Sequence, residues 1–425
     1  MKSKVKSLLS NQGTLAWIVW SVSAVFLLFQ FFLQLSSADI VGGLMDSFTL
    51  SAFGASVLAS TYYYIYVSLQ APAGILIDRL GPRRLLASGA LVCAGGCWLF
   101  ATAKLLLIAV LGRLLMGGGA AFAFVGSLSL ISRWFPISRF ALMVAVAETI
   151  GMFGAVFGGT LLAHLVIHFG WRASIQGAAV LAAMIAVLLW AIVRDTPPNS
   201  VPVPLPETNF WQDLKMLTNK KVAWINGAYS GLMFAVQTVF IALWGVQFLQ
   251  TSHHLSLTMA ALICNLVFIG VCFGGPVLAW LDSHFPWRKQ ITCYTALCAM
   301  VLISMVIYLP GLPLWIVGIL MLLLGFVGSS YVLTFAIANE IAPAYMRSTS
   351  VGFVNMLSVG SGPILQPLAG LLLLISSHHG VDYTVGEYQI ALSILPICLL
   401  LAAWCSRYLP VFRPSLRAPE DQSNT

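Results

Sequence analysis

Long apolar runs separated by short polar segments fill most of the chain. A helix needs about 20 apolar residues to cross the hydrocarbon core of a bilayer, and by that measure the pattern predicts twelve spans. They lie at residues 14–41, 51–76, 84–103, 105–132, 139–165, 171–193, 222–249, 256–281, 289–309, 313–339, 347–375 and 388–409. The runs are too long and continuous for a membrane β-barrel, whose strands alternate over segments of about 10 residues. The pattern therefore predicts an all-α membrane protein with twelve transmembrane helices.

Composition agrees with membrane insertion, because 60% of the residues are hydrophobic and only 8% are charged. A soluble domain normally carries about 25% charged residues, so this chain has too few to cover a surface facing water. The Lys and Arg behind the formal charge of +8 lie in short segments between apolar runs. They form no basic patch interleaved with aromatics, which argues against nucleic-acid binding.

The positive charges are also unevenly distributed between the two sides. An even number of spans places both termini on one side, and cytoplasmic loops carry an excess of Lys and Arg. Of the 21 Lys and Arg, only Lys104 and Arg172 fall on the opposite side, and Arg113 lies within a span. This pattern indicates twelve spans with both termini in the cytoplasm. The first run is longer than the roughly 7–15 apolar residues of a signal peptide, which remains the alternative interpretation.

The longest polar interruption, residues 194–221, leaves six spans on either side of it. Its prolines predict an extended start, and the stretch NFWQDLKML predicts a short helix along the inner membrane surface, anchored by Trp211. We therefore expect four parts: an N-terminal six-helix bundle over 1–193, a cytoplasmic linker over 194–221, a C-terminal six-helix bundle over 222–409 and a cytoplasmic tail over 410–425.

The two halves repeat one another weakly. The stretch PAGILIDRLGPRR at 72–84 recurs as PVLAWLDSHFPWR at 276–288, with a Pro, an Asp and an Arg at the same spacing. An Arg followed fifteen residues later by a glycine-containing motif also occurs in both halves, as Arg139 with Gly154 and as Arg347 with Gly362. Two related six-helix halves with a solute site between them are typical of secondary transporters.

The motifs themselves resemble those of the major facilitator superfamily. The stretch GILIDRLGPRR is similar to that family's loop between spans two and three, G-x-x-x-D-R-x-G-R-R, with Pro82 inserted. The matching positions are Gly74, Asp78, Arg79, Gly81, Arg83 and Arg84. The stretch RLLMGGGAA resembles the fourth-span motif R-x-x-x-G-x-G-A through Arg113, Gly117, Gly119 and Ala120. The resemblance covers the whole chain and implies a secondary transporter that works by alternating access.

A third motif departs from the family pattern. GAVFGG, with Gly154, Gly158 and Gly159, resembles the fifth-span motif G-P-x-x-G-G, but Ala155 replaces the proline. The proline form is associated with antiporters in this family, so the departure weakens an interpretation as a drug exporter. The other half carries the proline, in Gly362-Pro363. We expect these glycines and this proline to act in helix packing.

The resemblance also implies a gate on the inner side. Asp78 would face the N-terminus of the eleventh span near Arg347, and a helix N-terminus attracts a carboxylate. The repeat keeps Asp282 and Arg288 but has Ser283 and Phe285 where the first copy has Arg79 and Gly81. We therefore expect an asymmetric inner gate that is stronger on the amino-terminal half.

Ionisable residues within the spans are few, and each costs roughly 2.5–3.5 kcal/mol to insert at the bilayer centre. Glu148 is the first candidate for a proton carrier or cavity group, since a buried carboxyl can be tuned to exchange a proton. The resemblance implies that Arg113 takes part in proton coupling, and Asp39 is placed to pair with it. The alternatives are a structural hydrogen-bonding role for Arg113, a neutral packing role for Glu148 and a solvated helix end at Asp39.

Uncharged polar and aromatic residues complete the candidate substrate cavity. Tyr62 and Tyr66 share one helix face, although such aromatics commonly pack between helices. Asn355 nearly occupies the repeat position of Glu148, so we expect the amino half to handle protons and the carboxyl half to hold substrate. The full cavity set is Tyr62, Tyr66, Gln237, Gln247, Asn265, Tyr331, Asn355 and Gln366.

The sequence contains no motif for ATP hydrolysis or for the common hydrolytic enzymes. The chain has no P-loop, no G-x-S-x-G elbow and no HExxH, which argues against ATP-driven transport and against an enzyme. None of the eight Cys forms a CxxC pair, and His164 and His168 have no third ligand, so we expect neither a metal nor a cofactor.

Together these features indicate a proton-coupled symporter that takes up a small organic solute. The main alternative is a proton-coupled antiporter that exports drugs or a secreted metabolite, and a non-transporting membrane sensor is the third hypothesis. We expect a monomer in the plasma membrane (the inner membrane of a bacterium), with a small molecule, protons and the lipid bilayer as its partners and no nucleic acid.

Overall fold

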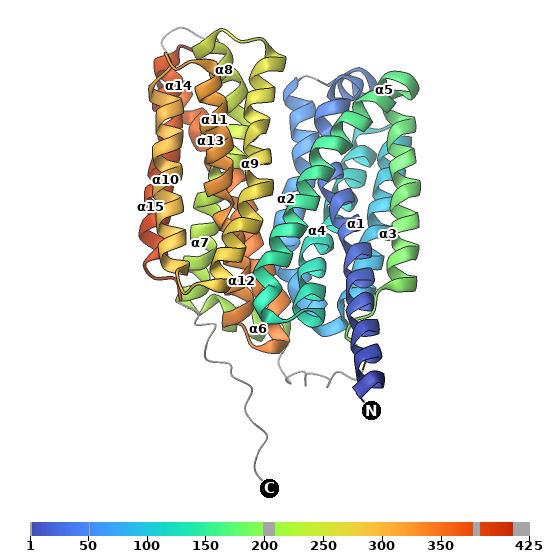
Figure 1. Ribbon diagram of the computed structural model, residues 1–425. Coiled ribbons are helices and arrows are strands. Elements are labelled where there is room, and N and C mark those ends of the chain that lie inside the picture. Colours follow the sequence, from blue (N-terminus) through green and yellow to red (C-terminus); the bar gives the residue numbers. More distant parts are fainter. Residues whose placement is uncertain (1, 51, 199–208, 377–382, 411–425) are drawn as a thin grey trace. The chain divides into compact units, whose positions relative to one another are not determined.

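The computed structural model describes residues 2–50, 52–198, 209–376 and 383–410. The described residues contain helices and no strand, which confirms the all-α prediction (Figure 1). The α-helices are α1 (Lys2–Phe48), α2 (Ala52–Leu80), α3 (Pro82–Thr102), α4 (Leu106–Trp134), α5 (Phe140–Ile192), α6 (Phe210–Thr218), α7 (Lys221–Ala235), α8 (Gly245–His253), α9 (Leu257–His284), α10 (Arg288–Tyr308), α11 (Leu314–Gly328), α12 (Leu333–Ile341), α13 (Arg347–Ser376), α14 (Val385–Leu392) and α15 (Ile394–Ser406).

The helices follow the predicted spans, with local departures inside three of them. A π-helical segment, Val236–Trp244, joins α7 to α8, and a 3-10 turn, Ser329–Val332, joins α11 to α12. The third departure is the break between α14 and α15 at Ser393. Among the described residues, eleven helical stretches are long and apolar enough to cross a membrane. Helix α2 is not among those eleven, but its 29 residues cover the second predicted span.

Two glycines with positive φ lie between consecutive predicted spans. Gly81 separates α2 from α3 with φ +84°, and Gly170 bends α5 with φ +78°. Glycine enters this region without the steric cost that a side chain would add. Since the backbone of Gly170 is not helical, the two helical parts of α5 meet there, and they correspond to the fifth and sixth predicted spans.

The chain divides into two compact units. Unit 1 holds residues 1–136, 147–219 and 338–356, and unit 2 holds 137–146, 220–337 and 357–425, as far as these ranges are described. The start of α13 thus packs with the amino-terminal helices, and the start of α5 packs with the carboxyl-terminal ones. The division into six-helix bundles over 1–193 and 222–409, with a linker over 194–221 and a tail over 410–425, remains a prediction.

Small residues let the helices of unit 1 approach closely. A Cβ atom on Gly117 would lie 2.4 Å from the Tyr62 carbonyl oxygen, and one on Gly119 would lie 2.4 Å from the Gly89 carbonyl oxygen. Gly154 of α5 is equally close to α1, with 2.3 Å to the Leu28 carbonyl oxygen. These contacts bring backbones together as small residues do in membrane helix pairs.

The remaining positions predicted for helix packing lie in α13 and α5. Gly362 is buried against the Thr238 side chain in unit 2, whereas Pro363 within α13 is exposed. The surroundings of Gly158 and Gly159 lie outside the part of the chain that the structure describes.

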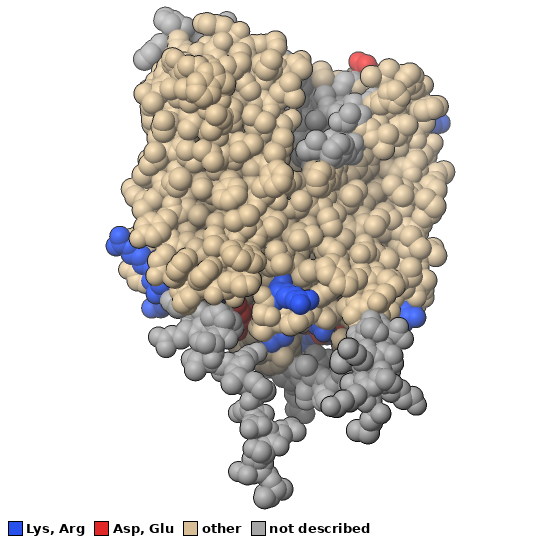
Figure 2. Space-filling model, in the orientation of Figure 1, with Lys and Arg blue, Asp and Glu red and all other residues tan. Residues whose placement is uncertain are grey.

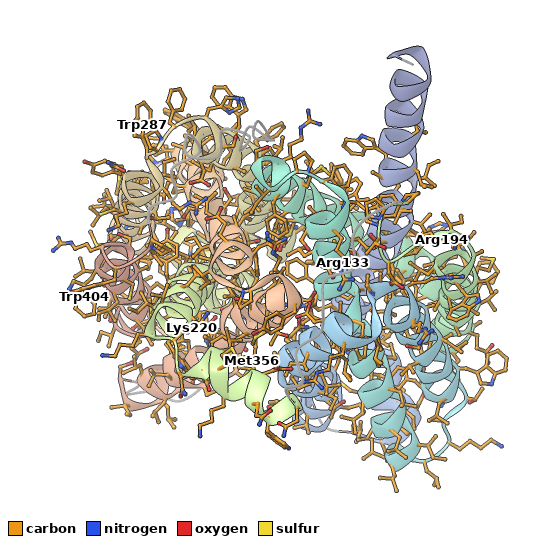
Figure 3. The ribbon with its side chains drawn as sticks, turned by 90° about the horizontal axis from the view of Figure 1, so that it is seen from below. Arg133, Arg194, Lys220, Trp287, Met356 and Trp404 are labelled. Carbon is orange, nitrogen blue, oxygen red and sulfur yellow. The ribbon has the colours of Figure 1, made fainter. Side chains whose placement is uncertain are left out.

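Charged side chains gather at the ends of the helices. On the face seen in Figure 2, the middle is free of Lys, Arg, Asp and Glu, and Lys and Arg are most numerous at the lower end. Arg133 and Arg194, labelled in Figure 3, both lie at one end of unit 1, where Trp134 donates a hydrogen bond to the Arg194 carbonyl over 3.1 Å. This is the end that the charge pattern predicts to be cytoplasmic.

Candidate functional site

A buried polar cluster forms around Tyr66 in unit 1. The Asn355 amide donates a hydrogen bond to Gln70 Oε1 over 2.9 Å. The Tyr66 hydroxyl hydrogen-bonds with the side chains of Asn355 and Gln70, and it interacts electrostatically with the Glu148 carboxyl. All four side chains are buried. The structure thus brings together Tyr66, Glu148 and Asn355 from the predicted set and adds Gln70, one turn beyond Tyr66 on α2.

The second buried ionisable residue, Arg113, lies against aromatic rings. Its guanidinium carbon is 5.3 Å from the centre of the Tyr62 ring and 5.7 Å from that of Phe100. Only 1% of Arg113 is exposed. A guanidinium over an aromatic face is attracted by the ring's negative face, and the attraction strengthens when water is excluded.

The two tyrosines connect these groups. The Tyr62 and Tyr66 rings are stacked, with centres 5.9 Å apart and planes inclined by 11°. Arg113, Tyr62 and Tyr66 therefore form a row of contacts, and the Glu148 carboxyl interacts electrostatically with its Tyr66 end. We call these four groups the ring row. Charges in such a low-dielectric interior influence one another more strongly than charges in water, so a proton gained or lost at Glu148 would be felt along the row. The side chain of Asp39 lies outside the described residues, so its pairing with Arg113 stays a prediction.

Removing the Tyr62 ring should weaken the fold around Arg113. We expect Tyr62→Leu to lower the free energy of unfolding by about 2 kcal/mol, the size of a desolvated cation–π interaction. Tyr62→Phe is the matched control, because it keeps the ring and loses only a hydroxyl that donates a long, 3.4 Å bond to the Gln30 carbonyl. Thermal unfolding of both variants in detergent measures the difference, and equal stability of the two would contradict the interaction.

The other predicted cavity residues lie in unit 2 and do not join the ring row. Gln366 donates a hydrogen bond over 2.7 Å to the Thr238 carbonyl of the π-helical segment, and Gln237 is buried in the same segment. Tyr331 is buried against Phe234, with ring centres 5.1 Å apart. Gln247 and Asn265 are exposed. A substrate role for these five residues remains a prediction.

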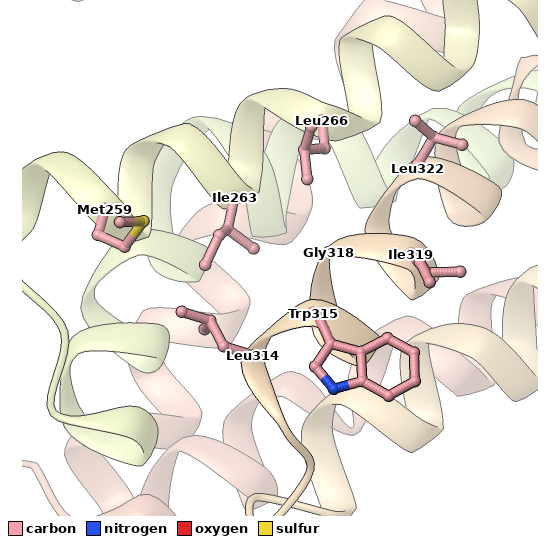
Figure 4. A pocket seen from close by; sticks show the side chains of 8 residues that line it. All are labelled: Met259, Ile263, Leu266, Leu314, Trp315, Gly318, Ile319 and Leu322. Atoms are coloured by element: carbon pink, nitrogen blue, oxygen red, sulfur yellow. The ribbon is translucent and has the colours of Figure 1, made fainter.

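An apolar groove in unit 2 offers no alternative solute site. It has a volume of about 690 Å³ and lies between α9 and α11 (Figure 4). Its lining residues are Met259, Ile263, Leu266, Leu314, Trp315, Gly318, Ile319 and Leu322. Since a solute site needs placed polar groups to fix orientation, this groove fits apolar matter such as lipid.

The predicted gate residue Asp78 is held at the start of α13. Its carboxylate accepts hydrogen bonds from the Ser348 backbone N–H at 3.1 Å, the Thr349 backbone N–H at 2.8 Å and the Thr349 hydroxyl at 2.7 Å. A helix N-terminus presents free N–H groups and positive dipole charge to such an anion. Asp78 lies beyond the predicted end of the second span, where burial raises the pKa of its carboxyl while these donors act to lower it.

Two glycines allow the backbones of α2 and α13 to touch beside Asp78. A Cβ on Gly74 would lie 2.4 Å from the Ser348 carbonyl oxygen, and one on Gly352 would lie 2.3 Å from the Gln70 carbonyl oxygen. Neither position could carry a side chain without moving a helix. We call the contact of Asp78 and Gly74 with Ser348 and Thr349 the inner latch.

The arginines of the same motif contact other elements. The Arg79 guanidinium pairs with Asp213 of α6. The backbone N–H of Arg83 donates to Asp195 over 2.8 Å, and its guanidinium donates to the Trp190 carbonyl and lies over the Trp190 ring. Arg84 is exposed. The motif therefore ties α13, α6 and the end of α5 to one corner of unit 1.

In the repeat of this motif in unit 2, the arginine and the aspartate pair with each other. Arg288 donates from Nε to Asp282 Oδ1 over 2.7 Å and from Nη2 to Oδ2 over 2.6 Å, and both side chains are buried. A two-pronged pair of this kind satisfies the carboxylate locally. Asp282 therefore has a bidentate partner six residues away, whereas Asp78 is satisfied by the N-terminus of α13.

A helical membrane protein that buries an arginine, a glutamate and polar side chains within its spans has the features of a solute transporter. A family model described as the Major Facilitator Superfamily matches residues 15–367, which is more than half of the chain. The protein belongs to this family of membrane transporters, and its twelve-helix membrane fold follows from that membership. The prediction that it is not an enzyme is confirmed in the same way.

Relatives and solved structures agree with the family. The gallate transporter of Pseudomonas putida is 24% identical over 408 residues, covering 86% of this chain and 88% of that protein. The hexuronate transporter of Bacillus subtilis is 22% identical over 365 residues, covering 78% and 81%. The structure of the Escherichia coli fucose:proton symporter matches with a TM-score of 0.68 and 17% identity over 92% of this chain and 99% of that one. The first matches among the curated relatives span only 53% and 31% of those proteins' lengths.

Proposed function

We propose that the protein is a proton-coupled symporter that takes up a small organic carboxylate by alternating access. The observation that carries this proposal is the ring row, in which two stacked tyrosines lie between a buried arginine that contacts one of them and a buried glutamate that interacts electrostatically with the other. Intramembrane ionisable residues mark proton and substrate pathways by default. Glu148 would carry the proton, and Arg113 would respond to its charge.

Two features support a carboxylate as the solute. Arg113 supplies a buried positive charge that an anionic solute can balance, and binding an anion near it would favour the state in which Glu148 is protonated and neutral. The relatives named above transport gallate and hexuronates, which are both carboxylates.

The inner latch supplies the conformational part of the cycle. The contact of Asp78 with α13 would hold the cytoplasmic side closed, and its release would let the solute leave inward. Since the repeat in unit 2 pairs Asp282 with Arg288 instead, the latch would act mainly through the amino-terminal motif. From the uneven distribution of Lys and Arg we infer that the protein lies in the plasma membrane with both termini in the cytoplasm.

The proposal is tested by solute flux in vesicles that contain the purified protein. Gallate, glucuronate and galacturonate form the test panel, and neutral fucose is the control solute. We expect at least one carboxylate to accumulate when the outside is acidic and to show no accumulation when the gradient is absent. Expulsion of the solute under the same gradient would indicate antiport, and binding without flux would indicate a sensor; either result would overturn the proposal.

A further inference from the structure

The linker helix α6 has two different faces. It is a nine-residue helix whose N-terminus is closed by a capping box between Asn209 and Gln212. With 3.6 residues per turn, positions four apart share a face. Asp213 and Leu217 form a buried face, while Trp211 and Lys215 lie one turn apart on the opposite, exposed face.

The buried face fixes the orientation of the helix. Asp213 pairs with Arg79 beside the inner latch, and the Tyr345 hydroxyl, two residues before α13, donates to Met216 Sδ over 3.6 Å. The helix therefore cannot rotate to bury its other face without breaking the Arg79–Asp213 pair. Trp211 consequently stays 71% exposed.

The exposed face has the composition of a membrane-interface surface. Leaving a large aromatic side chain in water forfeits much of the favourable burial that such side chains provide. Trp is enriched where membrane meets water, and a nearby Lys is attracted to anionic lipid headgroups. The acidic residue of α6, Asp213, is turned inward and paired with Arg79, so the exposed face carries positive charge alone.

We propose that the Trp211–Lys215 face of α6 binds anionic phospholipid at the cytoplasmic membrane surface. The indole would enter the headgroup boundary and the ammonium would contact the lipid phosphate. Because the opposite face of the same helix holds Arg79, next to Asp78, lipid bound to α6 would stabilise the inner latch. This surface lies outside the ring row and does not depend on the identity of the transported solute.

The test measures lipid contact with Trp211 directly and needs no solute. The full-length protein is placed in nanodiscs with increasing fractions of acyl-brominated phosphatidylglycerol or phosphatidylcholine, and bromine quenches tryptophan fluorescence on contact. The difference in tryptophan fluorescence between the unaltered protein and Trp211→Phe gives the contribution of Trp211, which we call the Trp211 component. We expect this component to be half quenched at a fraction of phosphatidylglycerol about fivefold lower than the fraction of phosphatidylcholine that has the same effect. An attraction of about 1 kcal/mol per cationic side chain gives a preference of this size.

Three variants separate the proposal from general contact with lipid. Lys215→Gln should make the two lipids equally effective. Asp213→Asn should also reduce the preference, since the helix loses its fixed orientation, while Asp213→Glu should retain it. The matched control is Trp98 of α3, which is 54% exposed in a predicted span and should be quenched equally by both lipids. A Trp211 component that neither lipid quenches, or that both quench equally in the unaltered protein, would overturn the proposal.

Discussion

Replacing Glu148 with glutamine should abolish proton-driven accumulation of the solute while leaving exchange of the solute across the membrane intact. Glutamine has nearly the shape of a protonated glutamate but cannot gain or lose a proton. One pH unit is worth about 1.4 kcal/mol per proton, so a one-proton symporter should accumulate its solute about tenfold under that gradient. The variant should equilibrate the solute with no accumulation.

The matched control for this variant is Glu148→Asp, which keeps the titratable group at the end of a shorter side chain. We expect it to accumulate solute more slowly and to the same final ratio, because coupling depends on the proton and not on the rate. Uptake of labelled solute is followed in vesicles with and without the gradient. Accumulation by Glu148→Gln equal to that of the unaltered protein would show that Glu148 does not carry the proton.

Asp78→Asn should release the inner latch. The asparagine side chain loses the charge that two backbone N–H groups and the Thr349 hydroxyl now satisfy. Hydrogen bonds to a charged group contribute about 1.5–3 kcal/mol, so the population with the latch open should rise about tenfold or more. A buried residue of α13, Ser350, reports on this opening when it is replaced by cysteine.

Labelling of that cysteine by a membrane-impermeant thiol reagent, read by mass at the labelled peptide, measures the opening. The rate should rise about tenfold with Asp78→Asn, in proportion to the open population. Arg84→Gln is the control, since Arg84 belongs to the same motif but is exposed. Equal labelling rates for the two variants would contradict a latch at Asp78.

Local pattern was sufficient to predict the helices and several of the site residues. The length of each apolar run determines where a helix can cross the membrane, and the spacing of Tyr62 and Tyr66 places both on one face of α2. The cost of burying charge singled out Arg113 and Glu148. The resemblance of the 72–84 stretch to a known motif led to Asp78, which the structure places against the N-terminus of α13.

Partners that come from distant segments could not be predicted in this way. Ser348 and Thr349 bind Asp78 through two backbone N–H groups, which every residue but proline possesses, and through the Thr349 hydroxyl. Neither kind of donor distinguishes these two residues from the other Ser and Thr of the chain. Asp213 is the partner of Arg79 because α6 folds back onto α2, a contact that no local pattern encodes. Gln70 could have been found, since it follows Tyr66 by one helical turn on the same buried face of α2.

These contacts also change the expectation that the amino half handles protons while the carboxyl half holds substrate. Asn355 nearly repeats the position of Glu148 in the carboxyl half, which predicts a role in substrate binding. In the structure, Asn355 hydrogen-bonds with Gln70 and Tyr66 in unit 1, in the same cluster as Glu148. The proposed proton and substrate groups therefore share one cluster, which is a short path for coupling them.

The central claim is that a proton enters with the solute, and a pH-sensitive dye trapped inside the vesicles tests it most directly. With equal pH on both sides, adding the transported carboxylate outside should acidify the interior of vesicles that hold the unaltered protein. The same addition to Glu148→Gln vesicles should leave the interior pH unchanged while labelled solute still exchanges. Solute entry without acidification in the unaltered protein, or with a rise in interior pH, would contradict proton symport.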